Sequence, residues 1–401
     1  MSNPLIHLSY TGFNKYFEVE NPSKFFLEPS YSKHPEFSSR VINVQPYSSA
    51  DFGKKIVFEI PKHGQFVHNI QLAITVPRLV ATSGTIAGWT NSMMYALIDR
   101  VELEIGGKIF DRRSGVQMDI TDELTSKSGH SQGKNLMSGK KEVISNTNDS
   151  EPKTFILTLD FWFNNKPEQS LPIALLHEQK IKLNFYFKDF SECVVYDGTT
   201  QPIPVSISKC ELLVEYYYIG KEDMKPFIEK SYSKEGLNYL IETNVFDNYE
   251  VIKENQKTHN SVLNFKYPVK EINWVLVEED SINNNDWFNY SVRDTNTSPL
   301  KNTRLILDGI TQTTDYLSEY YFRLIQNQQF HSVIPLKYIY SYSFAREPEN
   351  IDITGSLNLS LVNESSLNMN FNDIKESRLY VFGKTYNIFS ICKGEAFIRQ
   401  D

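Results

Sequence analysis

Apolar and polar residues alternate with a period of two along the whole 401-residue chain, and this alternation limits what the chain can fold into. Successive side chains of a strand point to opposite faces, so half-buried antiparallel strands show this pattern. It predicts strands at residues 56–60, 71–76, 101–105, 154–159, 180–187, 211–219, 271–277, 303–307, 338–344, 352–361 and 378–382. Turn-forming pairs such as Gly106-Gly107 and Asp308-Gly309 lie between them. The chain is expected to be all-β.

Helical periodicity is limited to two short stretches. Residues 114–124 begin with a serine that can cap a helix, and residues 314–325 carry apolar side chains on one face. We expect both to cap loops of the sheets rather than form a helical layer.

The charged stretch at residues 221–226 follows a predicted strand and suggests a domain boundary between 220 and 234. We expect two domains, residues 1–222 with a leading segment and residues 223–401. Each has a suitable length for one β-sandwich. No period of 20 to 50 residues is visible, which argues against a solenoid or a propeller.

Composition excludes several classes of protein. The 41 Lys and Arg against 49 Asp and Glu give a net charge of -8, which argues against a general nucleic-acid binder. Three scattered cysteines cannot form a disulfide framework, so a reducing compartment is expected. The first ten residues do not resemble a secretory signal, and no apolar stretch approaches the ~20 residues of a membrane span. We therefore expect a soluble protein made in the cytosol.

Motifs for chemistry are absent or incomplete. The eight histidines are dispersed, and His177-Glu178 starts a zinc motif that Ile181 does not complete. Residues 129–135 resemble a phosphate loop but have Asn135 where Ser or Thr would bind magnesium, so we interpret them as a polar surface loop. Tyrosines at 216–218 and at 338, 340 and 342 could stack sugars or bases, but the lack of interleaved basic residues favours core and intersubunit packing. We expect no catalytic, metal-binding or cofactor-binding residue.

Several segments, read together, resemble the major capsid proteins of the nucleocytoplasmic large DNA viruses of eukaryotes. The segments are Asn21–Phe26, Phe58–Gly64, Trp89–Asn91, Ile98–Gly107, Phe161–Asn164, Leu171–Leu175, Tyr267–Trp274, Tyr340–Ala345 and Gly355–Ser360. Their number, order and spacing are similar to those of the family. The chain departs from the family pattern at Gln65, Tyr267 and Leu359, where the family usually has Asp, His and an aromatic residue.

The resemblance marks ten positions as structural motif residues. They are Phe161, Trp162, Phe163, Pro172, Pro268, Lys270, Glu271, Trp274, Gly355 and Asn358. It assigns a catalytic role to none of them.

The resemblance also implies a fold and a function. The fold would be two tandem eight-stranded jelly-roll sandwiches, a double jelly roll, with short loop helices. The protein would be a non-enzymatic virion capsid protein, synthesised and assembled in the host cytoplasm, whose homotrimers form pseudo-hexameric capsomers that tile an icosahedral shell. Its partners would be its own copies and minor capsid proteins beneath the shell. It would have no direct contact with nucleic acid, no cofactor, and an internal membrane nearby without insertion.

Other functions remain open on the sequence alone. The chain could be a minor capsomer or a scaffold paralogue of the same fold. A jelly-roll carbohydrate-binding protein is an alternative from another class, and a cupin-like enzyme is the least favoured.

Residues 281–302 form the longest polar, turn-rich stretch of the second half. Because Trp287, Phe288 and Tyr290 lie in its middle, we expect a loop that folds by packing on itself. The resemblance places it at the outward-facing top of the capsomer.

Overall fold

The computed structural model describes residues 36–79, 87–126, 129–140, 151–196, 201–313 and 315–399. Phe37–Asp401 form one compact unit. The motif at Asn21–Phe26 and the predicted helix start at Thr314 lie outside the described residues.

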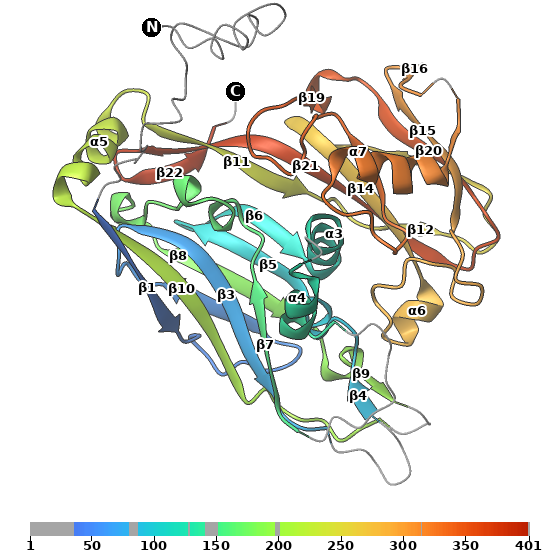
Figure 1. Cartoon of the computed structure of the whole chain (residues 1–401), viewed down its shortest axis with the longest axis horizontal. Coiled ribbons are helices and arrows are strands. Elements are labelled where there is room, and N and C mark those ends of the chain that lie inside the picture. The colour runs from blue at the N-terminus through green and yellow to red at the C-terminus, as the bar shows by residue number, and fades with distance from the viewer. Residues whose placement is uncertain are drawn as a thin grey trace, which may run out of the picture. The chain divides into compact units, whose positions relative to one another are not determined.

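The first half of this unit contains two four-stranded antiparallel sheets (Figure 1). One has the order β1 (Phe37–Val44), β10 (Lys209–Ile219), β3 (Phe66–Val76), β7 (Lys153–Thr158). The other has the order β2 (Lys55–Ile60), β8 (Ile181–Phe187), β5 (Ile98–Ile105), β6 (Lys108–Ser114). A small pair, β4 (Ala87–Trp89) and β9 (Val194–Tyr196), stands apart from both.

The second half repeats this arrangement with additions. Its first sheet contains β11 (Leu237–Val245), β21 (Ser377–Cys392), β14 (Pro268–Glu278) and β18 (Tyr340–Ser343), joined by β12 (Glu250–Ile252), β19 (Leu357–Asn358) and β22 (Glu395–Ile398). Its second sheet contains β13 (Thr258–Val262), β20 (Ser365–Phe371), β15 (Leu300–Leu307) and β16 (Ile310–Thr311), joined by β17 (Leu317–Ser318).

The order of the strands defines the fold of each half. If the eight main strands of a half are numbered along the chain, one sheet reads 1-8-3-6 and the other 2-7-4-5, and both halves obey this rule. Two packed sheets with this order form an eight-stranded jelly roll. The fold is therefore the double jelly roll that the resemblance implied, and we call its halves the first roll and the second roll.

The alternation of the sequence explains the cores. In β2, Ile56 and Phe58 are fully buried while Lys55 and Glu59 lie on the other face. In β14, Ile272, Trp274 and Leu276 point into the core of the second roll. Fully burying one such side chain contributes about 1.5–3 kcal/mol, so the two cores dominate stability.

Helices occupy the connections between strands. They are α2 (Met93–Leu97), α3 (Gly115–Thr125), α4 (Ser131–Ser138), α5 (Lys221–Tyr232), α6 (Glu279–Asn283) and α7 (Gln326–Phe330), which directly follows a π-helical turn at Tyr321–Ile325. Short 3₁₀ turns lie at Trp162–Asn164, Pro167–Gln169, Ile173–Leu175, Phe190–Glu192 and Leu359–Leu361. The predicted cap of α3 is correct, because the Ser114 side chain accepts a hydrogen bond from the amide of Gln117.

Three local predictions are wrong. Residues 129–135, interpreted as a surface loop, contain most of α4. The strand predicted at 352–361 is reduced to β19, because a 3₁₀ turn begins directly after it at Leu359. The second predicted helix begins only after β17, at residue 319. Among the described residues no helix is both long and apolar enough to cross a membrane.

Candidate functional site

The surface where the two rolls meet is the most distinctive polar region of the chain. Its apolar part joins β6 and the Trp162 turn of the first roll to β21. Phe110 and Trp162 both pack against Phe389, with ring centroids 5.7 and 5.6 Å apart. The core of the first roll therefore continues across the contact into Val275, Val277 and Phe389 of the second.

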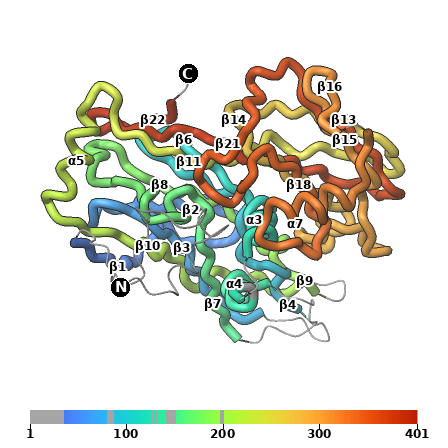
Figure 2. Tube along the Cα trace, turned by 45° about the horizontal axis from the view of Figure 1, so that its top comes forward, coloured from blue at the N-terminus to red at the C-terminus, as the bar shows by residue number. Residues whose placement is uncertain are grey.

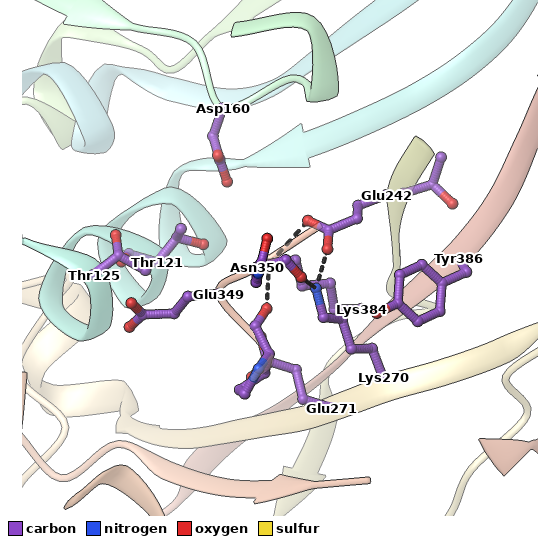
Figure 3. A network of polar contacts seen from close by, with 12 residues as sticks. Thr121, Thr125, Asp160, Glu242, Lys270, Glu271, Glu349, Asn350, Lys384 and Tyr386 are labelled. Carbon is purple, nitrogen blue, oxygen red and sulfur yellow. Dashed lines mark hydrogen bonds and ion pairs between the residues drawn. The ribbon is translucent and has the colours of Figure 1, made fainter. Parts of the chain in front are cut away.

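Two lysines and one glutamate form the centre of the polar part (Figure 3). Glu242 on β11 makes an ion pair with Lys270 of β14 and a second, 3.1 Å long, with Lys384 of β21. The Lys270 ammonium also donates to the backbone carbonyl of Asn350. Its side chain is fully buried, and this burial lowers the pKa of Lys270. Burial alone would also lower the pKa of Lys384, but Glu242 and Glu271 raise it. One buried carboxylate thus holds two cations that lie on adjacent strands.

His331 forms the second part of this region. Its ring nitrogens lie 3.3 Å from Glu271 and 3.5 Å from Glu349, and only 2 % of the side chain is exposed. Burial alone would raise the pKa of Glu349, but hydrogen bonds from His331 and Ser332 lower it. We call Glu242, Lys270, Glu271, His331, Glu349 and Lys384 the inter-roll cluster.

A cavity of about 40 Å³ lies within the inter-roll cluster. Side chains of α3 and β6 in the first roll line it, together with Glu242, Glu271 and Lys384. That volume has room for a few water molecules, which would hydrogen-bond to the surrounding polar groups. It is too small for the 300–1,000 Å³ typical of a small-molecule site.

A buried ion pair lies beside the cavity on β6. Arg113 and Asp111 are 2.9 Å apart, and both side chains are at most 4 % exposed. Burial raises the pKa of Asp111 to about 7, although Arg113 and the backbone amide of Arg112 act in the opposite direction. The Arg113 guanidinium also donates to the carbonyl of Asp160, which links β6 to the turn that carries Trp162.

The acidic face of α3 makes a second polar contact between the rolls. Fully buried Asp119 accepts hydrogen bonds from Tyr290 at 2.9 Å and from Lys337 at 2.8 Å, both on the second roll. The amide of Val333 donates to the carbonyl of Leu124 at the end of the helix. The two views accordingly draw α3 beside α7 (Figures 1 and 2).

The prediction that residues 281–302 form a loop that packs on itself is wrong, because its aromatic side chains contact the first roll. The indole of Trp287 donates to the carbonyl of Glu192, and Asn285 donates to the carbonyls of Ser191 and Val194. Phe288 packs edge-on against Tyr95. The aromatic residues therefore attach this loop to the first roll, because large apolar side chains are buried best where a partner surface is already present.

The structure brings some of the ten motif residues together and leaves others apart. Lys270 and Glu271 belong to the inter-roll cluster, and Trp162 lies at the apolar part of the same contact. Phe161 and Phe163 stack on each other in the first core, and Trp162 packs edge-on against Phe163. Pro172 precedes the 3₁₀ turn at Ile173–Leu175 and is not at the contact.

The remaining motif residues shape the second roll. Pro268 pairs with Asn358 across β14 and β19, and the Asn358 side chain caps the following 3₁₀ turn. Trp274 stacks on Tyr340 in the core, with ring centroids 5.9 Å apart. Gly355 has a φ of +147°, and a β-carbon there would lie 2.7 Å from the carbonyl oxygen of Phe344.

No pattern in the sequence indicates four members of the inter-roll cluster: Glu242, His331, Glu349 and Lys384. They come from separate elements, and no spacing along the chain links them. The one available signal was the pair Lys270-Glu271, because two adjacent charges begin a strand that otherwise has the composition of a core strand.

The polar groups of this site pair with one another at the contact between the two rolls. Within the described ranges, no cluster of three His, Cys, Asp or Glu side chains is arranged to hold a metal ion. Tyr216 and Tyr340 are fully buried, so neither can stack on a sugar. Two jelly rolls with one strand order, joined through a buried polar contact, define a protein of the double jelly-roll class.

Comparison with known proteins identifies the family. The family model described as the major capsid protein N-terminus matches residues 25–220, and the model of the large eukaryotic DNA virus major capsid protein matches residues 230–396. The chain belongs to this family of major capsid proteins.

Individual relatives agree with this result. The major capsid protein of Pyramimonas orientalis virus is 27% identical over 98% of both chains. That of Paramecium bursaria Chlorella virus 1 is 22% identical over 92% of this chain and 88% of the relative. Among solved structures, the PBCV-1 virus capsid matches 94% of this chain and 100% of its own with a TM-score of 0.78 at 19% identity. The Faustovirus major capsid protein matches 92% and 93% with a TM-score of 0.75 at 13% identity.

Proposed function

We propose that three copies of this chain form a homotrimeric, pseudo-hexameric capsomer, and that these capsomers tile a large icosahedral virus shell. The repeated strand order carries the proposal, because two like rolls in each chain give six like units in a trimer. The membership in a family of capsid proteins supports it further. A minor capsomer or a scaffold paralogue of the same fold is the alternative function.

Sedimentation and electron microscopy of the purified chain test this function. We expect particles of three times the 46.5 kDa chain mass, with six similar units around a threefold axis. A stable monomer at micromolar concentration would contradict the trimer. Presence in immature particles but not in mature virions would favour the scaffold alternative.

We also propose that residues 1–222 and 223–401 are the two domains, which is consistent with the ends of the two family matches. The ten motif residues act in this proposal by shaping and joining the rolls. The protein has no catalytic activity, is synthesised and assembled in the host cytoplasm, and contacts minor capsid proteins beneath the shell. An internal membrane lies nearby without insertion of this chain.

The proposed trimer does not bind nucleic acid directly. A net charge of -8 gives no general attraction to phosphates. In a filter-binding assay at 50 and 200 mM salt, we expect no retention of duplex DNA at micromolar trimer. Submicromolar binding that weakens steeply with salt would show that the proposal is wrong.

A further inference from the structure

A larger pocket also lies between the two rolls, with a volume of about 450 Å³. Residues at the start of β5, at the end of β6 and directly after β8 line it from the first roll. The loop between β11 and β12, the loop after α6 and β21 line it from the second roll. This volume lies within the roughly 300–1,000 Å³ of small-molecule sites, unlike that of the cavity in the inter-roll cluster. We call it the aromatic pocket.

Aromatic rings of both rolls line the aromatic pocket. Phe246 stacks on Tyr380 with ring centroids 5.9 Å apart, and the ring of Tyr249 lies 5.7 Å from that of Tyr380. Trp287 and Phe288 are buried and form another part of the lining, whereas Tyr249 is 43% exposed. Aromatic rings bind flat aromatic molecules by offset stacking and edge contacts, so this lining favours a ligand of that kind.

Four cationic side chains among the described residues line the aromatic pocket, and three of them have carboxylate partners. Arg100 and Arg112 pair with Glu102 at 3.3 and 3.0 Å. Arg378 donates to a glutamate of α6 at 2.9 Å. The fourth cation is Lys188, and no described carboxylate lies within ion-pair distance of its ammonium group. Cations that leave bulk water are normally paired, so Lys188 is an exception in this pocket.

Lys188 follows β8 directly, and its ammonium group lies over the face of the Trp287 ring, 3.1 Å from the centroid. The side chain is partly buried and lines the pocket, so the amine can be reached from there. An aromatic face attracts a cation, but unlike a carboxylate it has no net charge. The Lys188 amine is therefore in a position to react with a molecule that the pocket binds.

Burial also changes the acidity of this amine. It lowers the pKa of Lys188 from 10.5 to about 8. Cys193, Glu192 and Asp99 act in the opposite direction, and Arg378 acts in the same direction as burial. The other ionisable groups that line the pocket are Tyr95, Arg100, Arg112, Asp247, Tyr249 and Tyr380. Near neutral pH, more of this amine is uncharged than in an exposed lysine, and only the uncharged amine attacks a carbonyl carbon.

We propose that Lys188 is a covalent binding site for small aromatic aldehydes, which the aromatic pocket holds against its amine. The amine nitrogen adds to the carbonyl carbon, and a C=N bond, a Schiff base, replaces the C=O bond. Both hydrogens of the neutral amine leave with the carbonyl oxygen as one water molecule, so no oxidant or reductant takes part. The pocket lies within a single chain, so this inference does not depend on the proposed trimer.

Reductive trapping tests the proposal. The full chain is incubated at pH 7 with a limiting amount of 2-hydroxybenzaldehyde and sodium cyanoborohydride, which reduces the Schiff base to a stable amine, and is then mapped by peptide mass spectrometry. We expect the adduct at Lys188 to form about tenfold faster than at any exposed lysine. The N-terminal amine is counted separately, because its ordinary pKa is already near 8. Adducts spread over the exposed lysines with no excess at Lys188 would overturn the proposal.

Lys188→Arg keeps the positive charge and removes the reactive amine, so the fast adduct should be lost. Lys55→Arg is the matched control. The Lys55 ammonium also lies over a ring, 5.1 Å from the centroid of Tyr186, but its side chain is exposed. This variant should keep the fast adduct at Lys188. Equally fast labelling of the Lys188→Arg chain would contradict the proposal, and the map of the wild type locates the adduct even if this variant does not fold.

The pH dependence separates Lys188 from the exposed lysines. The ratio of the adduct at Lys188 to the mean adduct at exposed lysines should fall as the pH rises from 7 to 10, because exposed amines become uncharged only near pH 10. A ratio that does not change with pH would show that the Lys188 amine has no special reactivity.

Tyr249→Ala tests whether the pocket selects the ligand. Loss of this ring should slow trapping of 2-hydroxybenzaldehyde at Lys188 about tenfold, since part of the stacking surface is removed. Trapping of acetaldehyde, which has no ring, should be unchanged. If the ratio of the two rates is the same in the variant and in the wild type, the pocket does not select aromatic aldehydes and the proposal is wrong.

Discussion

Lys270 is a fully buried cation whose ammonium group contacts Glu242 and a backbone carbonyl. Such a group is stabilising only while its partners remain, because an uncompensated buried charge costs several kcal/mol. We expect Lys270→Met to lower the free energy of unfolding by about 3 kcal/mol, since Glu242 keeps only Lys384. Urea denaturation followed by circular dichroism measures the change.

Lys375→Met is the control for this experiment. Lys375 pairs with Asp280 at 2.8 Å, but these side chains are 42 and 50% exposed. Water screens exposed ion pairs, so they contribute little and this variant should be close to the wild type. Equal losses in the two variants would mean that the inter-roll cluster does not stabilise the chain.

Asp122 on α3 gives a stability contribution that depends on pH. Burial alone would raise its pKa, but Lys140, Ser126 and Lys134 lower it to about 2 from 3.8. Because the folded-state pKa is the lower one, the contribution is present above about pH 4 and is lost as the pH falls through about 2. We expect Asp122→Asn to lower the free energy of unfolding by about 2 kcal/mol at pH 7 and by much less at pH 2.

Unfolding measured from pH 7 to pH 2 checks this prediction. Glu222→Gln is the comparison, because Glu222 is 82% exposed in its pair with Lys225 and should show little change across the range. A deficit for Asp122→Asn that stays constant down to pH 2 would contradict the assigned direction.

At the scale of elements, Gly355 fixes the path of the chain between β18 and β19. Its φ is positive, and a β-carbon added at this position would lie 2.7 Å from the carbonyl oxygen of Phe344. A side chain therefore fits here only if the backbone shifts. We therefore expect Gly355→Ala to lower the free energy of unfolding by about 3 kcal/mol, because the backbone strain and the clash both destabilise the variant. Thermal unfolding measures it.

Gly309→Ala separates these two causes. Gly309 also has a positive φ, +76°, but no atom lies within 4 Å of its β-carbon position. Only the backbone strain opposes an alanine here, so Gly309→Ala should lower the free energy of unfolding by about 1 kcal/mol. If the two alanine variants lose the same stability, the close carbonyl has no effect.

Strands were predicted well because their signal is local. In β5 and β8 apolar residues of the core alternate with charged or polar residues of the outer face, so the sequence pattern shows which side of each strand faces the core. α5 was missed because Met224 is its one buried large apolar residue and Pro226 lies inside it. The contacts of Trp287 could not be predicted, because its partner Glu192 is far away in sequence. The same reason hid the inter-roll cluster, whose six members come from several elements of the second roll and meet only when that roll has folded.

At the scale of the molecule, the loop after α6 has an attached base and an exposed tip. Arg293 to Thr297 are exposed, and a bridge between Val292 and Thr297 closes the tip. We expect a short epitope tag inserted after Thr295 to leave the trimer intact and to be bound by antibody on the outside of assembled particles. Native gels and immunogold labelling of whole particles measure both.

A tag inserted after Asn285 is the control, since that side chain donates to two carbonyls of the first roll. This insertion should destabilise the chain although it lies in the same loop. A Thr295 tag that is reached by antibody only in broken particles would place the tip inside the shell.

The position of β21 in its sheet also affects how the chain is made. β21 lies between β11 and β14, and β12 and β22 pair with it as well, yet it is translated after all of them except β22. A ribosome that has not reached residue 377 therefore carries a second roll whose central strand is missing, with β11 and β14 unable to join. Chains cut short before β21 cannot complete the roll and cannot take a place in an assembly. We therefore expect that only chains translated through β21 can enter an assembly.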